Sequence, residues 1–148
     1  MNIHVNINAT EMLRGVSTVV YQAADHAAAK RWYAELLGIE PYFDRLGCAE
    51  FRFGDYQHEL GLLDASFAPQ LGGAAAPASG PGGVITYWPV GDVPATLERL
   101  LAMGATPYHP PRDFGEGFIG ASVIDPFGNI LSIMYNPHYL EVLGARKA

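Results

Sequence analysis

The hydrophobic and polar positions of the chain follow the same order twice. Val16–Gln22 has the composition of a strand, and in the segment that ends at Leu37 apolar residues recur every three or four positions, as on one face of a helix. Val84–Val90 and the segment Val93–Met103 repeat this strand and helix. The two apolar stripes, expected in the core, are Ala29, Trp32, Tyr33, Leu36 and Leu37 in the first helix, and Val93, Leu97, Leu100 and Leu101 in the second. The pattern therefore predicts one structural unit that is used twice.

Residues that favour helix ends stand in equivalent places of both copies. Asp25 and Asp92, 67 positions apart, precede the helical segments, and an Asp side chain accepts hydrogen bonds from the first free N–H groups of a helix. Gly38 and Gly104 follow the segments and tolerate the left-handed conformation that commonly ends a helix. We therefore expect the helices to begin and end at these residues.

Three short strand candidates follow each helix. They are 39–44, 49–53 and 57–63 in the first copy, and 106–109, 118–124 and 130–135 in the second. Between the last two, Asp125–Asn129 has the composition of a tight turn, in which Pro126 restricts φ and Gly128 tolerates a positive φ. The sequence thus predicts an α+β fold of two repeated β-α-β-β-β modules.

The whole chain, 1–148, is expected to form a single domain with a substantial core. Its expected parts are module one at about 13–64, a flexible Gly-, Ala- and Pro-rich connector at 65–83, module two at about 84–136 and a C-terminal tail at 137–148. Met1–Glu11 alternates as a strand and is expected either at a sheet edge or as an arm that reaches a partner subunit. Within the tail, Tyr139–Leu143 is expected as a short amphipathic helix that docks on the body.

The amino-acid composition favours some classes of function and argues against others. The hydrophobic content of 49% favours an internal pocket or a subunit interface in addition to a core, whereas the net charge of −6 argues against binding to nucleic acid. No apolar run is long enough to span a membrane, and Met1–Val5 lacks the basic start of a signal peptide, so a cytoplasmic protein is expected. Cys48 is the single cysteine and cannot form an intramolecular disulfide.

Three motifs resemble those of the vicinal oxygen chelate superfamily, which includes glyoxalase I, extradiol dioxygenases and bleomycin-resistance proteins. They are Arg31–Gly38, Asp92–Val93 leading to Met103–Ala105, and Asp125–Asn129, in the order and spacing of the family over about residues 13–136. The resemblance implies that each module curls its strands into a half-barrel, with the helix on the convex side and a ligand cavity on the concave side. It also implies a homodimer, which the apolar composition favours.

The resemblance places metal ligands at Thr18, Glu59, Ile85 and Ser132, and only Glu59 is a strong ligand by its chemistry. Three protein ligands are the ordinary minimum for a catalytic metal. We therefore expect no catalytic metal and no other cofactor. The alternative is a divalent metal ion in a non-standard site, completed by His58, His109 or His4.

If those four positions face the cavity, side-chain alternation brings others in with them and turns Tyr21 and Trp88 the other way. The expected ligand-binding residues are Thr18, Val20, Gln22, Glu59, Ile85, Tyr87, Phe114, Ser132 and Met134. Phe114 belongs to the segment 108–118, which is expected as a rim or lid. Within it, Arg112 either clamps an anionic group or pairs with Asp113 or Glu116, and the pairing is favoured.

Glu59 has two interpretations. It is either a structural carboxylate, hydrogen-bonded or paired with an arginine, or a functional group. In the second case it is a general base or an anchor for a cationic ligand, with its pKa raised by apolar neighbours. Two functions follow. The first is a protein that binds an apolar or aromatic small molecule without a catalytic metal, as bleomycin-resistance proteins do. The alternative is a lyase, isomerase or dioxygenase of the same superfamily that uses Glu59. The sequence leaves open whether any reaction is catalysed.

Overall fold

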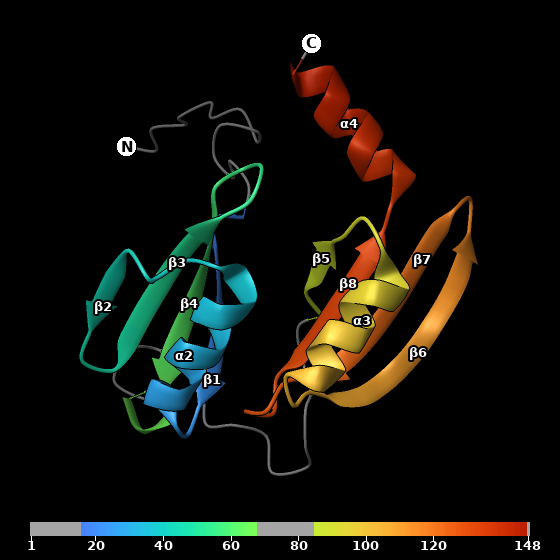
Figure 1. The fold of residues 1–148 in the computed structure, drawn as a ribbon. Helices are drawn as coiled ribbons and strands as arrows, with labels where there is room; N and C mark the ends of the chain where they lie inside the picture. Colours follow the sequence, from blue (N-terminus) through green and yellow to red (C-terminus); the bar gives the residue numbers. More distant parts are fainter. Residues whose placement is uncertain (1–15, 68–84, 148) are drawn as a thin grey trace, which may run out of the picture.

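The computed structural model describes residues 16–67 and 85–147, and it contains the two predicted modules side by side (Figure 1). The expected strand Met1–Glu11 and most of the connector lie outside the described residues; the connector's residues 65–67 form one short helical turn. Module one consists of β1 (Thr18–Ala23), α2 (His26–Leu37), β2 (Phe43–Arg45), β3 (Cys48–Phe53) and β4 (His58–Asp64). Module two consists of β5 (Tyr87–Pro89), α3 (Val93–Ala102), β6 (Thr106–Gly115), β7 (Phe118–Ile124) and β8 (Ile130–Tyr135).

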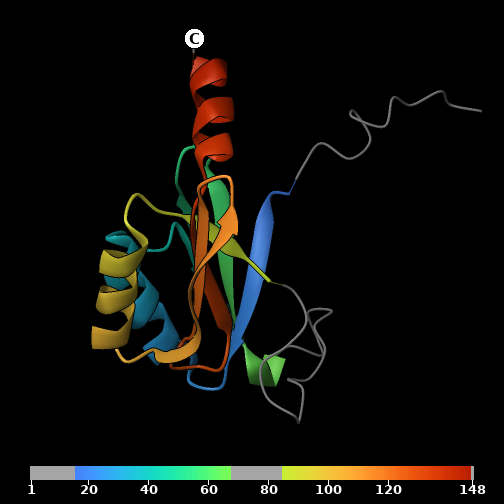
Figure 2. The ribbon, with the colours of Figure 1, turned by 90° about the vertical axis from the view of Figure 1, so that its right-hand side faces the viewer.

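Each module forms a four-stranded mixed sheet. The strand orders are β1-β4-β3-β2 and β5-β8-β7-β6, so the two sheets repeat one topology. In both, the first strand pairs in parallel with the last, and the remaining neighbours are antiparallel. The helices α2 and α3 lie on the same side of the molecule, which leaves the opposite faces of the sheets open (Figure 2). This confirms the predicted α+β fold of two curved β-α-β-β-β modules with helices on the convex side.

The predicted helix ends are confirmed. The Asp25 carboxylate accepts a hydrogen bond from the Ala28 N–H at 3.0 Å, and the Asp92 carboxylate accepts one from the Ala95 N–H at 2.9 Å. Gly38 ends α2 with a φ of 70°, and Gly104, with a φ of 98°, directly follows Met103, the capping residue of α3. Side chains with a Cβ disfavour this conformation. The same local chemistry therefore sets the length of both helices.

The core lies between the sheets and the helices. Tyr21, Tyr33 and Phe51 are buried in it, and Trp32 packs against them, as the apolar stripe predicts. Tyr21 and Trp88 face this core rather than the open side, as the alternation predicts. Leu101 is the exception among the expected core residues, because it remains 37% exposed at the last turn of α3.

Three strand predictions differ from the structure in their length. β2 covers only Phe43–Arg45 of the region predicted as a strand from residue 39, and β5 covers only Tyr87–Pro89. Pro41 lacks the N–H group that continued pairing needs. Next to β5, single backbone bonds remain, from the Ser132 N–H to the Thr86 carbonyl and from the Val90 N–H to the Met134 carbonyl. Conversely, β6 extends to Gly115, so much of the expected lid segment 108–118 is strand. β6 is an edge strand, so it can contain three prolines without losing bonds to a second neighbour. Its pairing with β7 is interrupted by shifts of register along the strand.

The tail helix α4 spans Pro137–Lys147 and is longer than predicted. It continues from β8 and extends beyond the two sheets (Figure 1). Its contacts reach module one: the Tyr139 hydroxyl donates to the Asp55 carboxylate at 2.9 Å, and the Arg146 guanidinium lies 4.3 Å from the centre of the Tyr56 ring. None of the described helices has the length and apolar character needed to cross a lipid bilayer.

Buried polar contacts join the two modules. The Tyr33 hydroxyl of α2 donates to the Asp125 carboxylate, between β7 and β8, at 2.5 Å. Asn129 donates from its side-chain amide to the Gln22 carbonyl of β1 at 3.0 Å, and Trp32 donates from its indole to the Met103 carbonyl at 2.7 Å. Burial, and after it the Asp125 carboxylate, raise the pKa of Tyr33 well above its usual value, so its hydroxyl stays a donor.

We predict that Tyr33→Phe lowers the free energy of unfolding by about 1–3 kcal/mol, because it removes a donor from a buried carboxylate while leaving the ring in place. Urea unfolding measures the change. Tyr135→Phe serves as the control, because Tyr135 is partly buried and its hydroxyl forms no hydrogen bond with the described residues. Equal effects of the two substitutions would contradict a special role for the Tyr33–Asp125 contact.

Candidate functional site

Four of the predicted ligand-binding residues line one pocket on the open face of module two. The pocket has a volume of about 620 Å³. Ile85, Tyr87, Phe114 and Ser132 are the four predicted residues. Its other lining residues are Tyr108, His109, Pro110, Arg112, Gly120, Ala121, Ser122 and Ile130. Most of the wall is apolar or aromatic, with few polar groups, which is typical of small-molecule sites.

Strand register explains why these residues meet. Tyr87 of β5 pairs with Ser132 of β8, Ser132 pairs with Ser122 of β7, and Ser122 pairs with His109 of β6. Residues paired in this way lie in one row across the sheet and project from the same face. The pocket therefore has an aromatic ring at one edge of the row, two hydroxyl groups in the middle and an imidazole at the other edge.

The floor of the pocket is a buried pair of serines. The Ser122 and Ser132 hydroxyl oxygens lie 2.9 Å apart, and the two residues are 8% and 0% exposed. One hydroxyl donates to the other, so only one of the two O–H groups is used in this bond. The pair thus presents unused hydrogen-bonding capacity at the bottom of an otherwise mostly apolar pocket.

One wall of the pocket depends on a glycine. A Cβ added to Gly120 would lie 3.2 Å from Cε2 of the Phe114 ring, so the absence of a side chain lets this ring lie over β7. The Arg112 guanidinium lies 5.0 Å from the centre of the same ring. Arg112 forms no ion pair with any residue of 16–67 or 85–147, so the expected pairing with Asp113 or Glu116 is wrong and its charge is available at the pocket.

The other predicted positions lie on module one or beside the pocket. Thr18, Val20 and Gln22 alternate along the open face of β1, and Val20 is 54% exposed. Met134 of β8 pairs with Gly120, one row beyond the serines, and does not line the pocket. A smaller cavity of about 130 Å³ lies at the junction of the modules and is lined by both Glu59 and Tyr87. The predicted residues therefore do not share one cavity.

Glu59 is held by an arginine. Its carboxylate accepts hydrogen bonds from the Arg52 guanidinium at 2.9 Å and from the Thr18 hydroxyl at 3.2 Å. The Arg52 guanidinium, followed by the Tyr42 hydroxyl, lowers the pKa of Glu59 from its usual value. This geometry matches the structural interpretation of Glu59, and the expectation of a raised pKa is wrong. Tyr42 itself donates to the Glu50 carboxylate at 2.8 Å, a bond that raises the pKa of Tyr42 to about 12.

The four positions where the family would place metal ligands do not fit a divalent cation. Ile85 has no donor atom and is 58% exposed, and the Ser132 hydroxyl is engaged with Ser122. Glu59 already interacts with the positive charge of Arg52, which would repel a metal ion. Within residues 16–67 and 85–147, no group of three His, Cys, Asp or Glu side chains is arranged to hold a metal.

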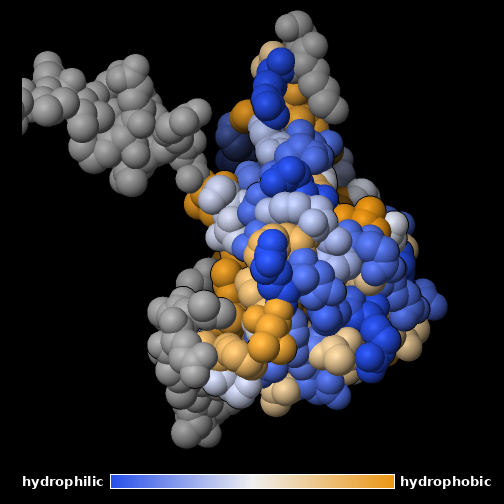
Figure 3. All heavy atoms as spheres, turned by 90° about the vertical axis from the view of Figure 1, so that its left-hand side faces the viewer, coloured by the Kyte–Doolittle hydropathy of each residue, from blue (hydrophilic) through white to orange (hydrophobic). Residues whose placement is uncertain are grey.

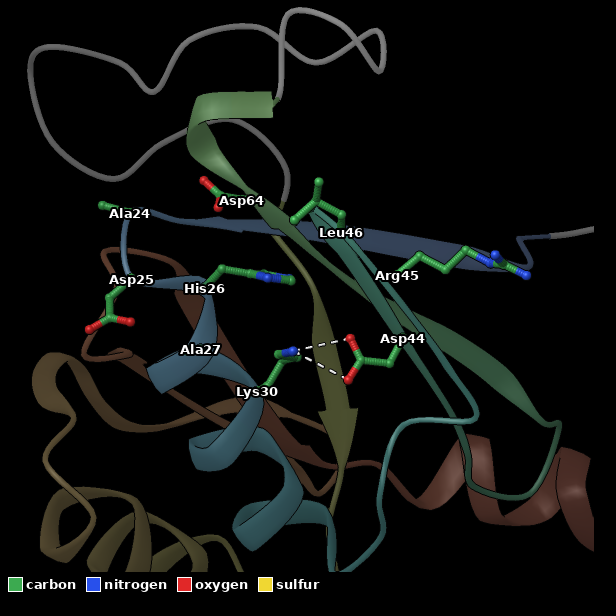
Figure 4. A pocket seen from close by; sticks show the side chains of 10 residues that line it. Ala24, Asp25, His26, Ala27, Lys30, Asp44, Arg45, Leu46 and Asp64 are labelled. Carbon is green, nitrogen blue, oxygen red and sulfur yellow. Dashed lines mark hydrogen bonds and ion pairs between the residues drawn. The ribbon is translucent and has the colours of Figure 1, made fainter.

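A second hollow, of about 820 Å³, lies between the start of α2 and the β2–β3 hairpin (Figure 4). Lys30 of α2 and Asp44 of β2 point toward each other and form an ion pair at 3.1 Å. The His26 ring binds the Leu62 carbonyl at 2.8 Å. Lys30, Asp44 and His26 are thus already engaged within the protein, so this hollow has fewer polar groups available to a ligand than the module two pocket has.

The surface of module one differs between its two sides. In Figure 3, hydrophobic residues gather toward the open face of the sheet, whereas the helix side is mostly hydrophilic. The exposed apolar residues of this module include Val16 and Val20, just before and within β1, which are 72% and 54% exposed. The open side is therefore the more apolar side of module one.

Comparisons with known proteins agree with this architecture. The family model of the glyoxalase-like domain matches residues 18–134. A glyoxalase-related enzyme from Fulvimarina pelagi has a TM-score of 0.69 and 26% identity, over 84% of this chain and 90% of that one. A lactoylglutathione lyase from Agrobacterium tumefaciens has a TM-score of 0.65 and 19% identity, over 84% and 96% of the two chains. A glyoxalase/bleomycin resistance protein/dioxygenase from Nocardioides has a TM-score of 0.61 and 22% identity, over 82% of each chain.

A search of curated protein sequences finds no match. The family match nevertheless spans most of the chain, from β1 to β8. The protein therefore belongs to the glyoxalase-like domain family, within the vicinal oxygen chelate superfamily.

We predict that Arg52→Gln raises the pKa of Glu59, because it removes the main cause of the lowered pKa and leaves the opposing effect of burial. Carboxyl chemical shifts in an NMR titration measure the pKa. In the wild type a folded-state pKa below the unfolded value makes stability fall as the pH drops through the acidic range, and this fall should be smaller in the variant. Arg45→Gln is the control. An unchanged Glu59 pKa in Arg52→Gln would contradict the assignment.

Proposed function

We propose that the protein binds an apolar or aromatic small molecule in the pocket of module two, without a catalytic metal. The observation that carries the proposal is the pocket itself, about 620 Å³ in volume with Tyr87 and Phe114 among its lining residues. This volume lies within the range of small-molecule sites. A homodimer and a cytoplasmic location are part of the same proposal, and light scattering on the purified protein tests the first.

The exposure of the pocket rings supports binding rather than packing. Tyr87 is 42% exposed and Phe114 is 54% exposed, although both are large aromatic residues that folding would normally bury. Their ring centres lie 6.2 Å and 5.4 Å from that of Phe118, so Phe118 is in ring contact with both lining residues. An aromatic ligand would cover this surface and gain both apolar burial and ring contacts.

The second candidate function is an enzyme, a lyase, isomerase or dioxygenase, that uses Glu59. Its support is that two structures similar to this chain are named as a glyoxalase-related enzyme and a lactoylglutathione lyase. The ion pair with Arg52 and the poor metal ligands around Glu59 make it the weaker candidate. Metal analysis separates the two: stoichiometric Zn, Fe, Mn or Ni that is lost in Glu59→Gln but kept in Glu50→Gln would overturn the first proposal.

We predict that at least one compound in a panel of aromatic antibiotics and metabolites binds, and that Tyr87→Ala raises its Kd about tenfold by removing a ring contact and the apolar area beneath it. Isothermal titration calorimetry measures the Kd of the compound for the wild type and for the variant. Tyr42→Ala is a matched control, because Tyr42 is 49% exposed and lies on module one.

Two results would contradict the proposed function. One is uniformly absent binding at millimolar concentrations of every compound in the panel. The other is a loss of affinity in Tyr42→Ala but not in Tyr87→Ala, which would place the ligand on module one.

A further inference from the structure

We infer that the module two pocket selects a planar aromatic anion that also carries a hydrogen-bond-acceptor oxygen, with this oxygen on the Ser122–Ser132 pair and the anionic group on Arg112. The inference rests on the proposed function and specifies the chemical class of its ligand. Three observations carry it: the serine pair at the floor, the charge of the lining residues, and the order of chemical groups along the sheet.

The serine pair requires an acceptor from the ligand. Ser122 and Ser132 are both more than nine-tenths buried and line the pocket, and their one mutual bond leaves one O–H group without an acceptor among the described residues. A buried donor that stays unpaired costs about 1–3 kcal/mol, whereas a ligand carbonyl, ether or hydroxyl oxygen would satisfy it. An entirely apolar ligand would seal this donor away from water, so the floor disfavours such a ligand.

The charge of the pocket favours an anion. Arg112 is the only Arg, Lys, Asp or Glu among the lining residues that the structure describes, although the chain has a net charge of −6. Within residues 16–67 and 85–147 its guanidinium forms no ion pair, and it lies 5.0 Å from the centre of the Phe114 ring. Guanidinium N–H groups bind carboxylates through charge-assisted hydrogen bonds. Because the chain as a whole is negatively charged, a positive charge in the pocket indicates an anionic ligand.

The arrangement of these groups fits one elongated molecule. The serines lie in the middle of the row from Tyr87 to His109, at the floor. Arg112 pairs with Gly120 on the next row, at the exposed edge strand β6. Tyr87 and Phe114, which provide aromatic contacts, come from β5 and β6, the two edge strands of the sheet. A flat ring system between them would place an acceptor oxygen inward and an anionic group outward.

Three naphthalene probes test the two interactions separately. They are 6-acetyl-2-naphthoate, which has both groups; 6-isopropenyl-2-naphthoate, which replaces the carbonyl oxygen with a methylene of similar shape; and 2-acetylnaphthalene, which lacks the carboxylate. We expect calorimetry on the full chain to show that the first probe binds about tenfold more tightly than the second and about fivefold more tightly than the third. Added salt should reduce only the preference for the carboxylate.

Variants assign each preference to its residues. The double variant S122A/S132A removes both hydroxyls together, so no unpaired donor remains, and should abolish the preference for the acetyl group while keeping that for the carboxylate. Arg112→Gln should do the reverse. Arg45→Gln is the matched control for Arg112→Gln, because Arg45 also stacks on a phenylalanine two positions away, at 5.5 Å, but lies on module one. If the double variant does not fold, as judged by thermal unfolding, S122C/S132C replaces it, because thiols are of similar size but donate hydrogen bonds only weakly, and the preference for the acetyl group should then fall.

The outcomes separate the inference from the proposed function. Similar affinities for the three probes in the wild type would overturn the inference and leave the binding function standing. Preferences that survive in both variants would overturn the assignment to the serines and Arg112. Binding of none of the probes would overturn the inference, and the proposed function would fall with it if binding were also absent throughout the aromatic panel.

Discussion

The Asp125 carboxylate is the contact on which the arrangement of the two modules depends. It is 3% exposed, and it accepts hydrogen bonds from the Tyr33 hydroxyl of module one and from the backbone N–H groups of Phe127 and Asn129. A buried carboxylate is stable only when several donors surround it, so the turn and α2 must both be in place. The same residue therefore fixes the hairpin geometry of module two and the packing of module one against it.

The consequence of that turn reaches the pocket through strand register. Because Asp125–Asn129 closes the hairpin without slippage, β7 and β8 pair regularly from Ile124 opposite Ile130 to Ile119 opposite Tyr135. Ser122 then stands opposite Ser132, and a shift of β8 by one residue against β7 would turn the Ser132 hydroxyl away from Ser122 and into the core. The position of the two serine hydroxyls at the pocket floor therefore depends on the hydrogen bonds of the turn between β7 and β8. This turn lies at one end of the two strands, next to α2.

Much of the fold could be predicted because it depends on local signals. Asp25, Asp92 and Gly38 define helix ends, and the bounds of β7 and β8 follow from alternation and a Pro-Gly turn. The site could be predicted only in part, because it depends on pairing between strands. Ser122 carries no motif of its own, yet its place opposite Ser132 could have been found by counting outward from the turn. The length of β6 could not, since its prolines indicate a loop until the sheet edge that tolerates them is known.

The substitutions at the family's metal positions change the kind of ligand that the scaffold can hold. A carboxylate at position 132 would make the pocket floor negative unless a cation bound there, whereas Ser132 makes it a neutral donor and acceptor. At position 59 the carboxylate is retained, but the Arg52 guanidinium supplies its counter-charge from within the protein. Arg112 is the only Arg, Lys, Asp or Glu among the described residues that line the module two pocket. A fold that elsewhere uses carboxylates to hold a cation can thus present a hydroxyl floor and a cationic rim, which suit an aromatic anion.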